Sequence, residues 1–353
     1  VILPTGKTVD LTRGQQTSSG PNLNLRTTDN STYNIPLPTY GHPNLDKNAA
    51  GLIYKGDALD LFIGAQGMGG AVSMVQLELD YRRQVNTGMI LFNDYNAALD
   101  FAMEVRSSLR GDKELYRTNP QENNLGLLSL EFFDGNALKY GTLPKGNSFP
   151  TNATAAIEYE IFKGDDSTFE NLVNLLERYD SSVIDSMQGD QDVIDFRKSI
   201  PDNVNSVTRR AGVHKVGTDL SVPNDQVKQI HVLYQQAMAE FTSYCGERET
   251  PATAMWGHGP WHVHLNFIPT NQRELGKAME LYTDLLQMAI RLGGSPSGEH
   301  GLAKKYVTVN NKRVSPLEHF IGQEGLKQTA ATYAPINPGL RFCHGNLGTL
   351  YIR

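Results

Sequence analysis

The stretch MWGHGPWHVHLNF, Met255–Phe267, places three histidines within seven residues. In an extended strand, side chains alternate between two faces, so His262, His264 and Asn266 share one face and apolar residues share the other. The apolar face is typical of a core and the polar face of a site. A turn rich in glycine and proline follows His258 and can fold this histidine over the polar face. From these residues alone, metal ligation and a hydrogen-bonded polar strand edge both stay open.

A second polar motif, SGEHGLA, begins at Ser297. Glycines flank the adjacent Glu299 and His300, so the backbone can bring both side chains close to a ligand. The carboxylate can bind a divalent metal while the imidazole acts as a base. Two histidines and one carboxylate leave a coordination position open, which is typical of a catalytic metal site.

A glycine-rich turn lies in DLFIGAQGMGGAVSMVQLEL, where an apolar run leads into it and an alternating strand over 72–79 leaves it. Its glycines are Gly64, Gly67, Gly69 and Gly70. Such glycines let backbone N–H groups approach a ligand, as phosphate-binding loops require. The pattern is neither G-x-G-x-x-G nor a P-loop, so on its own it favours a bulged hairpin.

The composition is that of an ordinary globular chain of 353 residues, with 39% hydrophobic and 20% charged residues. At roughly 150 residues per domain, this length indicates about two domains. The net charge of −6 and the lack of a Lys/Arg block argue against nucleic-acid binding. Two distant cysteines argue against a disulfide framework or an iron–sulfur site, and no apolar run approaches the roughly 18 residues of a membrane span. We expect a cytoplasmic protein, with peripheral membrane association left open.

The hydrophobic periodicity predicts a mixture of strands and helices. We expect a hairpin over 1–12, an irregular segment over 14–48, and strands over 88–93, 125–133, 155–162 and 214–223. We expect helices over 96–109, over 169–179 with Thr168 as the cap, over 192–200 ending before Pro201, over 226–244, and after the histidine strand with Leu275 to Ile290 on one stripe. This order favours an α+β fold with an antiparallel sheet and helices on one face.

Five motifs together resemble those of a known family. They are DLFIGAQGMGGAVS, HKVGTDLSVP, GHGPWHVHLN, SGEHGLA and INPG, in this order. The chain resembles the FAD-linked oxidases with the vanillyl-alcohol-oxidase type fold, in particular their D-2-hydroxyacid dehydrogenase branch, which includes D-lactate dehydrogenase, the glycolate oxidase flavin subunit and D-2-hydroxyglutarate dehydrogenase. The branch motifs read roughly G-H-x-G-D-x-N-x-H-x-N and S-G-E-H-G-[IV]-G.

The resemblance implies three parts. Residues 1–85 correspond to the second half of a PCMH-type FAD-binding domain, 86–325 to a ferredoxin-like cap domain with an antiparallel sheet, and 326–353 to a C-terminal segment that returns to the FAD site. The part of the FAD-binding domain that cradles the flavin pyrophosphate precedes these residues in the family. We expect a fragment of a longer protein, with a separate N-terminal chain or a lost cofactor as alternatives.

The resemblance also implies residue roles. A divalent metal, zinc or alternatively manganese or iron, is expected at His258, His264 and Glu299, with His300 as the base. The substrate is expected to bind Arg197, Lys215 and Asn266. The FAD is expected to bind Gly64, Gly67, Gly69, Gly70 and Asn337. The histidine motif is one residue shorter here than in the family, and Gly259-Pro260 replaces Gly-Asp, so His262 is an alternative to His264. Ala303 replaces a glycine, and Gln66 replaces a glutamate.

The expected reaction is oxidation of a D-2-hydroxy acid, of the lactate, glycolate or 2-hydroxyglutarate class, to the 2-keto acid. The expected partners are this small anionic substrate and an electron acceptor that the sequence does not identify. A separate N-terminal FAD-binding half is a partner under the alternative in which that half is another chain. Three alternatives stay open: a metal-free alcohol oxidase of the same fold, a non-catalytic assembly subunit of a flavoprotein complex, and a hydrolase with the same metal ligands.

Overall fold

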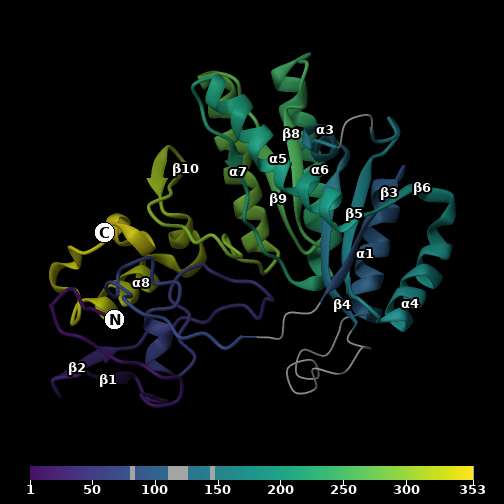
Figure 1. The fold of residues 1–353 in the computed structure, drawn as a ribbon. Helices are drawn as coiled ribbons and strands as arrows, with labels where there is room; N and C mark the ends of the chain where they lie inside the picture. The colour runs from purple at the N-terminus through teal and green to yellow at the C-terminus, as the bar shows by residue number, and fades with distance from the viewer. Residues whose placement is uncertain (80–83, 110–125, 144–147, 353) are drawn as a thin grey trace. The chain divides into compact units, whose positions relative to one another are not determined.

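The computed structural model describes residues 1–79, 84–109, 126–143 and 148–352, which form two compact units (Figure 1). The first unit comprises Val1–Leu77, Asp219–Pro223 and Thr283–Arg353. The second comprises Glu78–Thr218 and Asn224–Tyr282. The division follows contacts between residues, and the three parts that the sequence predicts stay a prediction.

The second unit contains an antiparallel sheet with the strand order β6-β3-β5-β4-β8-β9-β7. Its strands are β3 (Val85–Phe92), β4 (Leu127–Asp134), β5 (Ala155–Phe162), β6 (Val183–Gln188), β7 (Val216–Gly217), β8 (Thr253–His258) and β9 (His262–Phe267). The central strands β3, β5 and β4 lie side by side and pair over nearly their whole length (Figure 1). The predicted strand over 214–223 is reduced to β7, and residue 125 of another predicted strand lies outside the described residues.

Helices contact both faces of this sheet. The helices of this unit include α1 (Tyr95–Leu109), α3 (Gly135–Tyr140), α4 (Asp166–Leu176), α5 (Asp190–Arg210) and α6 (Val227–Cys245), with the short 3-10 turns Glu177–Ser182 and Asn224–Gln226; of these, α4 packs on α1. In β4, Phe132 packs against Tyr95 of α1 with ring centroids 5.3 Å apart, and Phe133 packs against Phe196 of α5 at 6.0 Å. Successive strand residues point to opposite faces. The predicted antiparallel α+β fold is confirmed, although the helices cover two faces and not the one expected.

Two helix ends differ from the sequence prediction. Helix α5 continues through Pro201, although proline cannot donate the usual backbone bond to the Arg197 carbonyl. Burial of Phe196, Ile200 and Val204 on both sides of the proline holds the helix together. Helix α4 begins after Asp165, whose carboxylate accepts the Thr168 N–H at 3.1 Å, so Asp165 and not Thr168 is the cap.

The first unit has its own core around a hairpin that the sequence analysis assigned to an irregular segment. The hairpin consists of β1 (Asn22–Arg26) and β2 (Thr32–Pro36). Leu23, Leu25 and Ile35 are fully buried, so the alternation in NLNLR was a strand signal that many neighbouring polar residues obscured. The remaining elements are β10 (Val307–Val309), β11 (Lys312–Val314), α8 (Pro316–Tyr333) and the 3-10 turns Ala58–Leu61, Pro338–Leu340 and Asn346–Tyr351, while α7 (Gln272–Arg291) starts in the second unit and ends in the first.

The alternating segment 72–79 does not form the predicted strand. The neighbouring residue Ala71 forms an isolated bridge with Ile2. Ile2 also forms an isolated bridge with Thr8, and this bridge stands in the place of the hairpin expected over 1–12. Met74 is 85% exposed, and the other large apolar side chains of the segment are also exposed. Alternation produces a strand only where a neighbouring strand supplies backbone partners, and no described residue does so here. Among the described helices, none is both long and apolar enough to cross a membrane.

Candidate active site

The SGEHG motif lies in a tightly held loop of the first unit. Ser295 and Ser221 exchange two backbone hydrogen bonds of 2.8 and 3.1 Å. Gly294 precedes this pair, and a Cβ at its position would lie 2.3 Å from the Ser221 carbonyl oxygen. The close approach therefore requires glycine and fixes where the loop carrying Glu299 begins.

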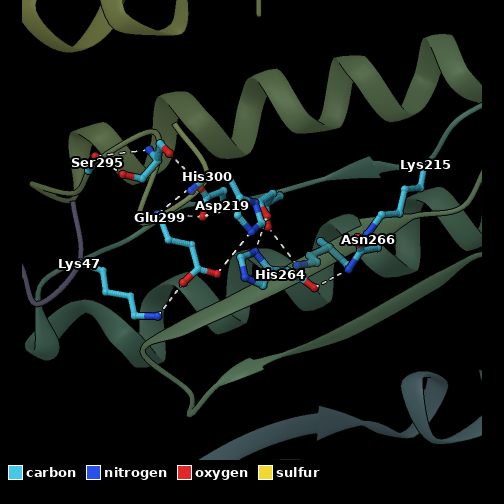
Figure 2. Close-up of polar contacts among 11 residues, drawn as sticks. Lys47, Lys215, Asp219, His264, Asn266, Ser295, Glu299 and His300 are labelled. Atoms are coloured by element: carbon cyan, nitrogen blue, oxygen red, sulfur yellow. Dashed lines mark hydrogen bonds and ion pairs between the residues drawn. The ribbon is translucent and has the colours of Figure 1, made fainter. Parts of the chain in front are cut away.

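The carboxylate of Asp219 holds this loop in place through hydrogen bonds. Its carboxylate is buried, with the residue 3% exposed, and accepts the Ser297 hydroxyl, the His300 N–H at 2.9 Å and the Glu299 N–H at 3.3 Å (Figure 2). These bonds orient the backbone that carries the predicted ligand and the predicted base. Asp219 is not among the residues predicted from the sequence, where its local signal is a carboxylate placed beside the apolar residues of DLSV.

Three donor atoms gather at this loop. One ligand atom from each of Asp219, Glu299 and His300 lies within 4.8 Å of the other two. Two carboxylates and an imidazole are a suitable donor set for zinc, manganese or iron. Glu299 also forms an ion pair with Lys47, with 2.7 Å between Nζ of Lys47 and Oε2 of Glu299. The other carboxylate oxygen, Oε1 of Glu299, lies 3.4 Å from Nε2 of His300. Lys47 was also missed from the sequence.

The histidine strand belongs to the second unit, where its polar face is as predicted. His262 and His264 make a ring contact with centroids 4.8 Å apart, which places them on one face of β9. Nδ1 of His264 lies 2.9 Å from the Thr218 carbonyl oxygen. A carbonyl only accepts, so Nδ1 carries the proton and the lone pair lies on Nε2. His262 is only 1% exposed, so His264 is the more accessible ligand of the two.

Lys215 and Asn266 lie together on the same unit. The Lys215 ammonium donates to Oδ1 of Asn266 at 2.7 Å and lies 5.2 Å from the centre of the Trp256 ring. Burial lowers the pKa of Lys215, since desolvation disfavours the charged form. Substrate binding by Lys215 and Asn266 stays a prediction.

A row of polar residues crosses the sheet at one register. Glu158 of β5 lies opposite Glu131 of β4, Glu131 opposite His258 of β8, and His258 opposite His262 of β9. From α5, a guanidinium nitrogen of Arg197 lies 3.3 Å from Glu158 and 3.7 Å from Glu131. Burial raises the pKa of Glu158 to about 7, and the Arg197 charge opposes this shift. Substrate binding by Arg197 stays a prediction, and in the structure its charge faces two glutamates.

Most glycines of the predicted flavin loop are required by packing within the first unit. A Cβ at Gly67 would lie 2.4 Å from Sγ of Cys343, one at Gly69 2.8 Å from the Phe62 ring, and one at Gly70 2.3 Å from a backbone oxygen. A Cβ at Gly64 would meet open space. These contacts explain three of the glycines without a ligand, and flavin contact by the loop stays a prediction.

Asn337 and Gln66 connect this loop to later parts of the same unit. The Asn337 amide donates to the carbonyl oxygens of Met68 and Phe342 at 3.1 and 2.9 Å, so it holds the C-terminal segment against the loop. Gln66 accepts the Ala303 N–H at 2.7 Å, while its own buried Nε2 has no hydrogen-bond partner among the described residues. A buried donor without a partner is costly unless a ligand satisfies it, and a flavin carbonyl is a suitable acceptor.

The family assignment follows from the sequence comparison. Residues 118–315 match the family of FAD linked oxidases, C-terminal domain. This match covers more than half of the chain, so the protein belongs to the FAD-linked oxidase family. The members of this class are flavin-dependent oxidoreductases, and FAD is their cofactor.

The solved structures to which this chain is similar include p-cresol methylhydroxylase with substrate bound, with 12% sequence identity, a TM-score of 0.45, and coverage of 75% of this chain and 53% of that chain. A second is alkyldihydroxyacetonephosphate synthase, with 13% identity, a TM-score of 0.42, and coverage of 74% of this chain and 44% of that chain. This chain thus spans about half the length of these structures. No curated protein matches the sequence. None of these findings identifies a branch within the family.

Proposed function

We propose that this protein takes part in the FAD-dependent oxidation of a D-2-hydroxy acid to the 2-keto acid, with a divalent metal that orients the substrate. The observation that carries the proposal is the loop held by Asp219. It presents a carboxylate, Glu299, beside an exposed imidazole, His300, whose side chain is 58% exposed. A metal ligand next to an accessible base suits the removal of a proton from an alcohol.

Glu299, His264 and His258 are the proposed metal ligands. Two imidazoles and one carboxylate suit zinc and accept manganese or iron. When bound, the metal acts as a Lewis acid toward the substrate hydroxyl. His264 is prepared for this role because its Nδ1 donates to the Thr218 carbonyl, which leaves the lone pair on Nε2.

His300 is the proposed base. It takes the proton of the substrate hydroxyl, and the imidazolium that forms has the carboxylates of Asp219 and Glu299 at 3.9 and 3.4 Å from its ring nitrogens. The ammonium of Lys215, oriented by Asn266, is the proposed partner of the substrate carboxylate, together with Arg197. When bound, FAD would supply the redox chemistry of the oxidation, as the hydride acceptor.

The ion pair between Lys47 and Glu299 favours a second candidate, a metal-free alcohol oxidase of the same fold. In this reading the Lys47 ammonium occupies the position of a cation beside Glu299, at 2.7 Å. Substrate would then contact the histidines directly. Metal content measured on the purified protein separates the two candidates.

Several further roles are part of the same proposal. The substrate is a small anion of the lactate, glycolate or 2-hydroxyglutarate class, and a further acceptor takes the electrons from the flavin. A cytoplasmic location is also proposed.

The test combines flavin absorbance with metal analysis. The protein is loaded with FAD, its zinc, manganese and iron contents are measured, and a panel of D-2-hydroxy acids is added without oxygen. We expect one acid to bleach the flavin band, and we expect His300→Ala to abolish bleaching while FAD and metal stay bound. His344→Ala, another exposed histidine of the first unit, is the matched control. Failure of every D-2-hydroxy acid to bleach a sample that contains both FAD and metal would refute the proposal.

A further inference from the structure

His258 has a carboxylate partner of its own within the second unit. Its Nδ1 lies 3.0 Å from Oε1 of Glu131, a residue that the sequence analysis did not consider. The His258 side chain is half exposed, whereas that of Glu131 is 7% exposed. The contact therefore joins an accessible imidazole to a fixed, buried acceptor.

The register of the sheet brings these two residues together. Glu131 and His258 are direct cross-strand neighbours on β4 and β8, and such pairs have Cβ atoms about 4.5–5.5 Å apart. On its other side, His258 stacks on His262 with ring centroids 6.3 Å apart and an angle of 2° between the planes. The imidazole is thus held between a carboxylate and a parallel ring.

Glu131 is itself held by an ion pair. Arg197 of α5 lies between Glu131 and Glu158, which faces Glu131 from β5. Without a cation, two carboxylates directly opposite each other on one sheet face would repel. The guanidinium therefore allows Glu131 to stay buried as an acceptor beside His258.

We propose that Glu131 is a positioning residue that fixes the tautomer and the ring orientation of His258. A carboxylate accepts only, so His258 must place its proton on Nδ1 and its lone pair on Nε2. Nε2 is then the ring atom that can bind a metal ion. The metal part of this inference rests on the proposed function, whereas the effect of Glu131 on the tautomer does not.

The proposal also gives His258 and His264 the same arrangement by different means. His264 has Nδ1 in a hydrogen bond with the backbone carbonyl of Thr218, and in the proposal His258 donates from Nδ1 to the Glu131 carboxylate, whose Oε1 lies 3.0 Å away. Only the second partner can be removed by substitution. His264 therefore serves as an internal reference whose tautomer should not change when Glu131 is replaced.

The first measurement is the tautomer of each histidine, read from long-range proton–nitrogen NMR spectra of the metal-free protein with labelled histidines at about pH 8, where imidazoles are neutral. A His258→Gln sample identifies the signal. We expect the Nδ1–H form in the unmodified protein and a shift toward Nε2–H in Glu131→Leu. Glu160→Gln removes a carboxylate from the same face of β5 and should change nothing. An Nε2–H form in the unmodified protein would overturn the proposal even if Glu131→Leu does not fold, and Glu131→Gln provides a milder second variant.

The second measurement is zinc affinity by competition with a coloured chelator. We expect Glu131→Leu to weaken zinc binding by about 10- to 100-fold, as loss of such outer partners usually does, and Glu160→Gln to leave it unchanged. Equal affinity in Glu131→Leu and the unmodified protein would overturn the metal part of the inference. If the unmodified protein binds no zinc, zinc is removed from the proposed function, and the tautomer measurement still decides the role of Glu131.

Discussion

Asp134, at the end of β4, should make the second unit less stable as the pH rises. The residue is 3% exposed, and its Oδ1 accepts the N–H groups of Ala137 at 2.7 Å and Met255 at 2.9 Å. Burial raises its pKa from 3.8 to about 7, because desolvation outweighs these two bonds. Between these two values the folded state binds more protons than the unfolded state. Stability must therefore fall as the pH rises through this window and level off above it.

Asp134→Asn tests this reasoning, because asparagine resembles the protonated acid. Its carbonyl oxygen can accept the same two N–H groups and carries no charge. The pKa of Asp134 is about 7 in the folded state and 3.8 in the unfolded state. Relative to a side chain that cannot ionise, Asp134 therefore lowers the free energy of unfolding by up to about 4 kcal/mol at pH 8 and up to about 2 kcal/mol at pH 5. We therefore expect the substitution to stabilise the second unit, and to do so more at pH 8 than at pH 5.

The assay is urea unfolding followed by tryptophan fluorescence at pH 5 and pH 8. Both tryptophans of the chain, Trp256 and Trp261, lie in the second unit, so the signal reports on this unit. Glu158 also has a pKa of about 7 and adds to the pH dependence of the unmodified protein, so the comparison is made between the two proteins at each pH. Equal or lower stability of Asp134→Asn at pH 8 would refute the argument.

Three further substitutions have defined outcomes. Asp219→Ala should destabilise the first unit by about 1–3 kcal/mol, because it removes the acceptor for two backbone N–H groups. Thermal unfolding measures this loss, and an unchanged melting temperature would contradict the role given to Asp219. Lys47→Met should tighten zinc binding several-fold, because it removes the cation beside Glu299, and should change stability by less than about 1 kcal/mol. An unchanged zinc affinity would mean that Lys47 does not compete with the metal for Glu299. Gly67→Ala should destabilise the first unit more than Gly64→Ala does. Both glycines have positive φ, but only a Cβ at Gly67 would clash with a neighbour, Cys343. Equal melting temperatures of the two variants would contradict this prediction.

Local sequence patterns predicted how neighbouring polar side chains are arranged but not the residues that support them. Alternation along β9 and the glycines around Glu299 and His300 are local signals, and both predicted the arrangement of the nearby side chains. Lys47 is 252 residues away from Glu299, and no local pattern connects two such positions. Likewise, Glu131 meets His258 only because β4 and β8 pair, and strand pairing is a property of the folded chain.

The local rules failed where the surroundings decide the outcome. The alternation over 72–79 predicted a strand, but a strand also needs a paired neighbour. Pro201 predicted a helix end, but buried residues on both sides of it continue α5. Flavin contact by the glycines after Phe62 is implied by the family resemblance and stays a prediction, while contacts within the chain explain three of these glycines.

The polar row across the sheet also bears on how the protein avoids misfolding. Glu158, Glu131 and His258 meet at a single alignment of three strands. If β4 slipped by one residue, Glu131 would move to the opposite face, among the aromatic rings around Tyr95 and Phe132, and Arg197 would lose one of its partners. A misaligned sheet would thus bury an unpaired carboxylate at a cost of several kcal/mol. The residues that prepare His258 therefore also select the one strand alignment in which they can meet.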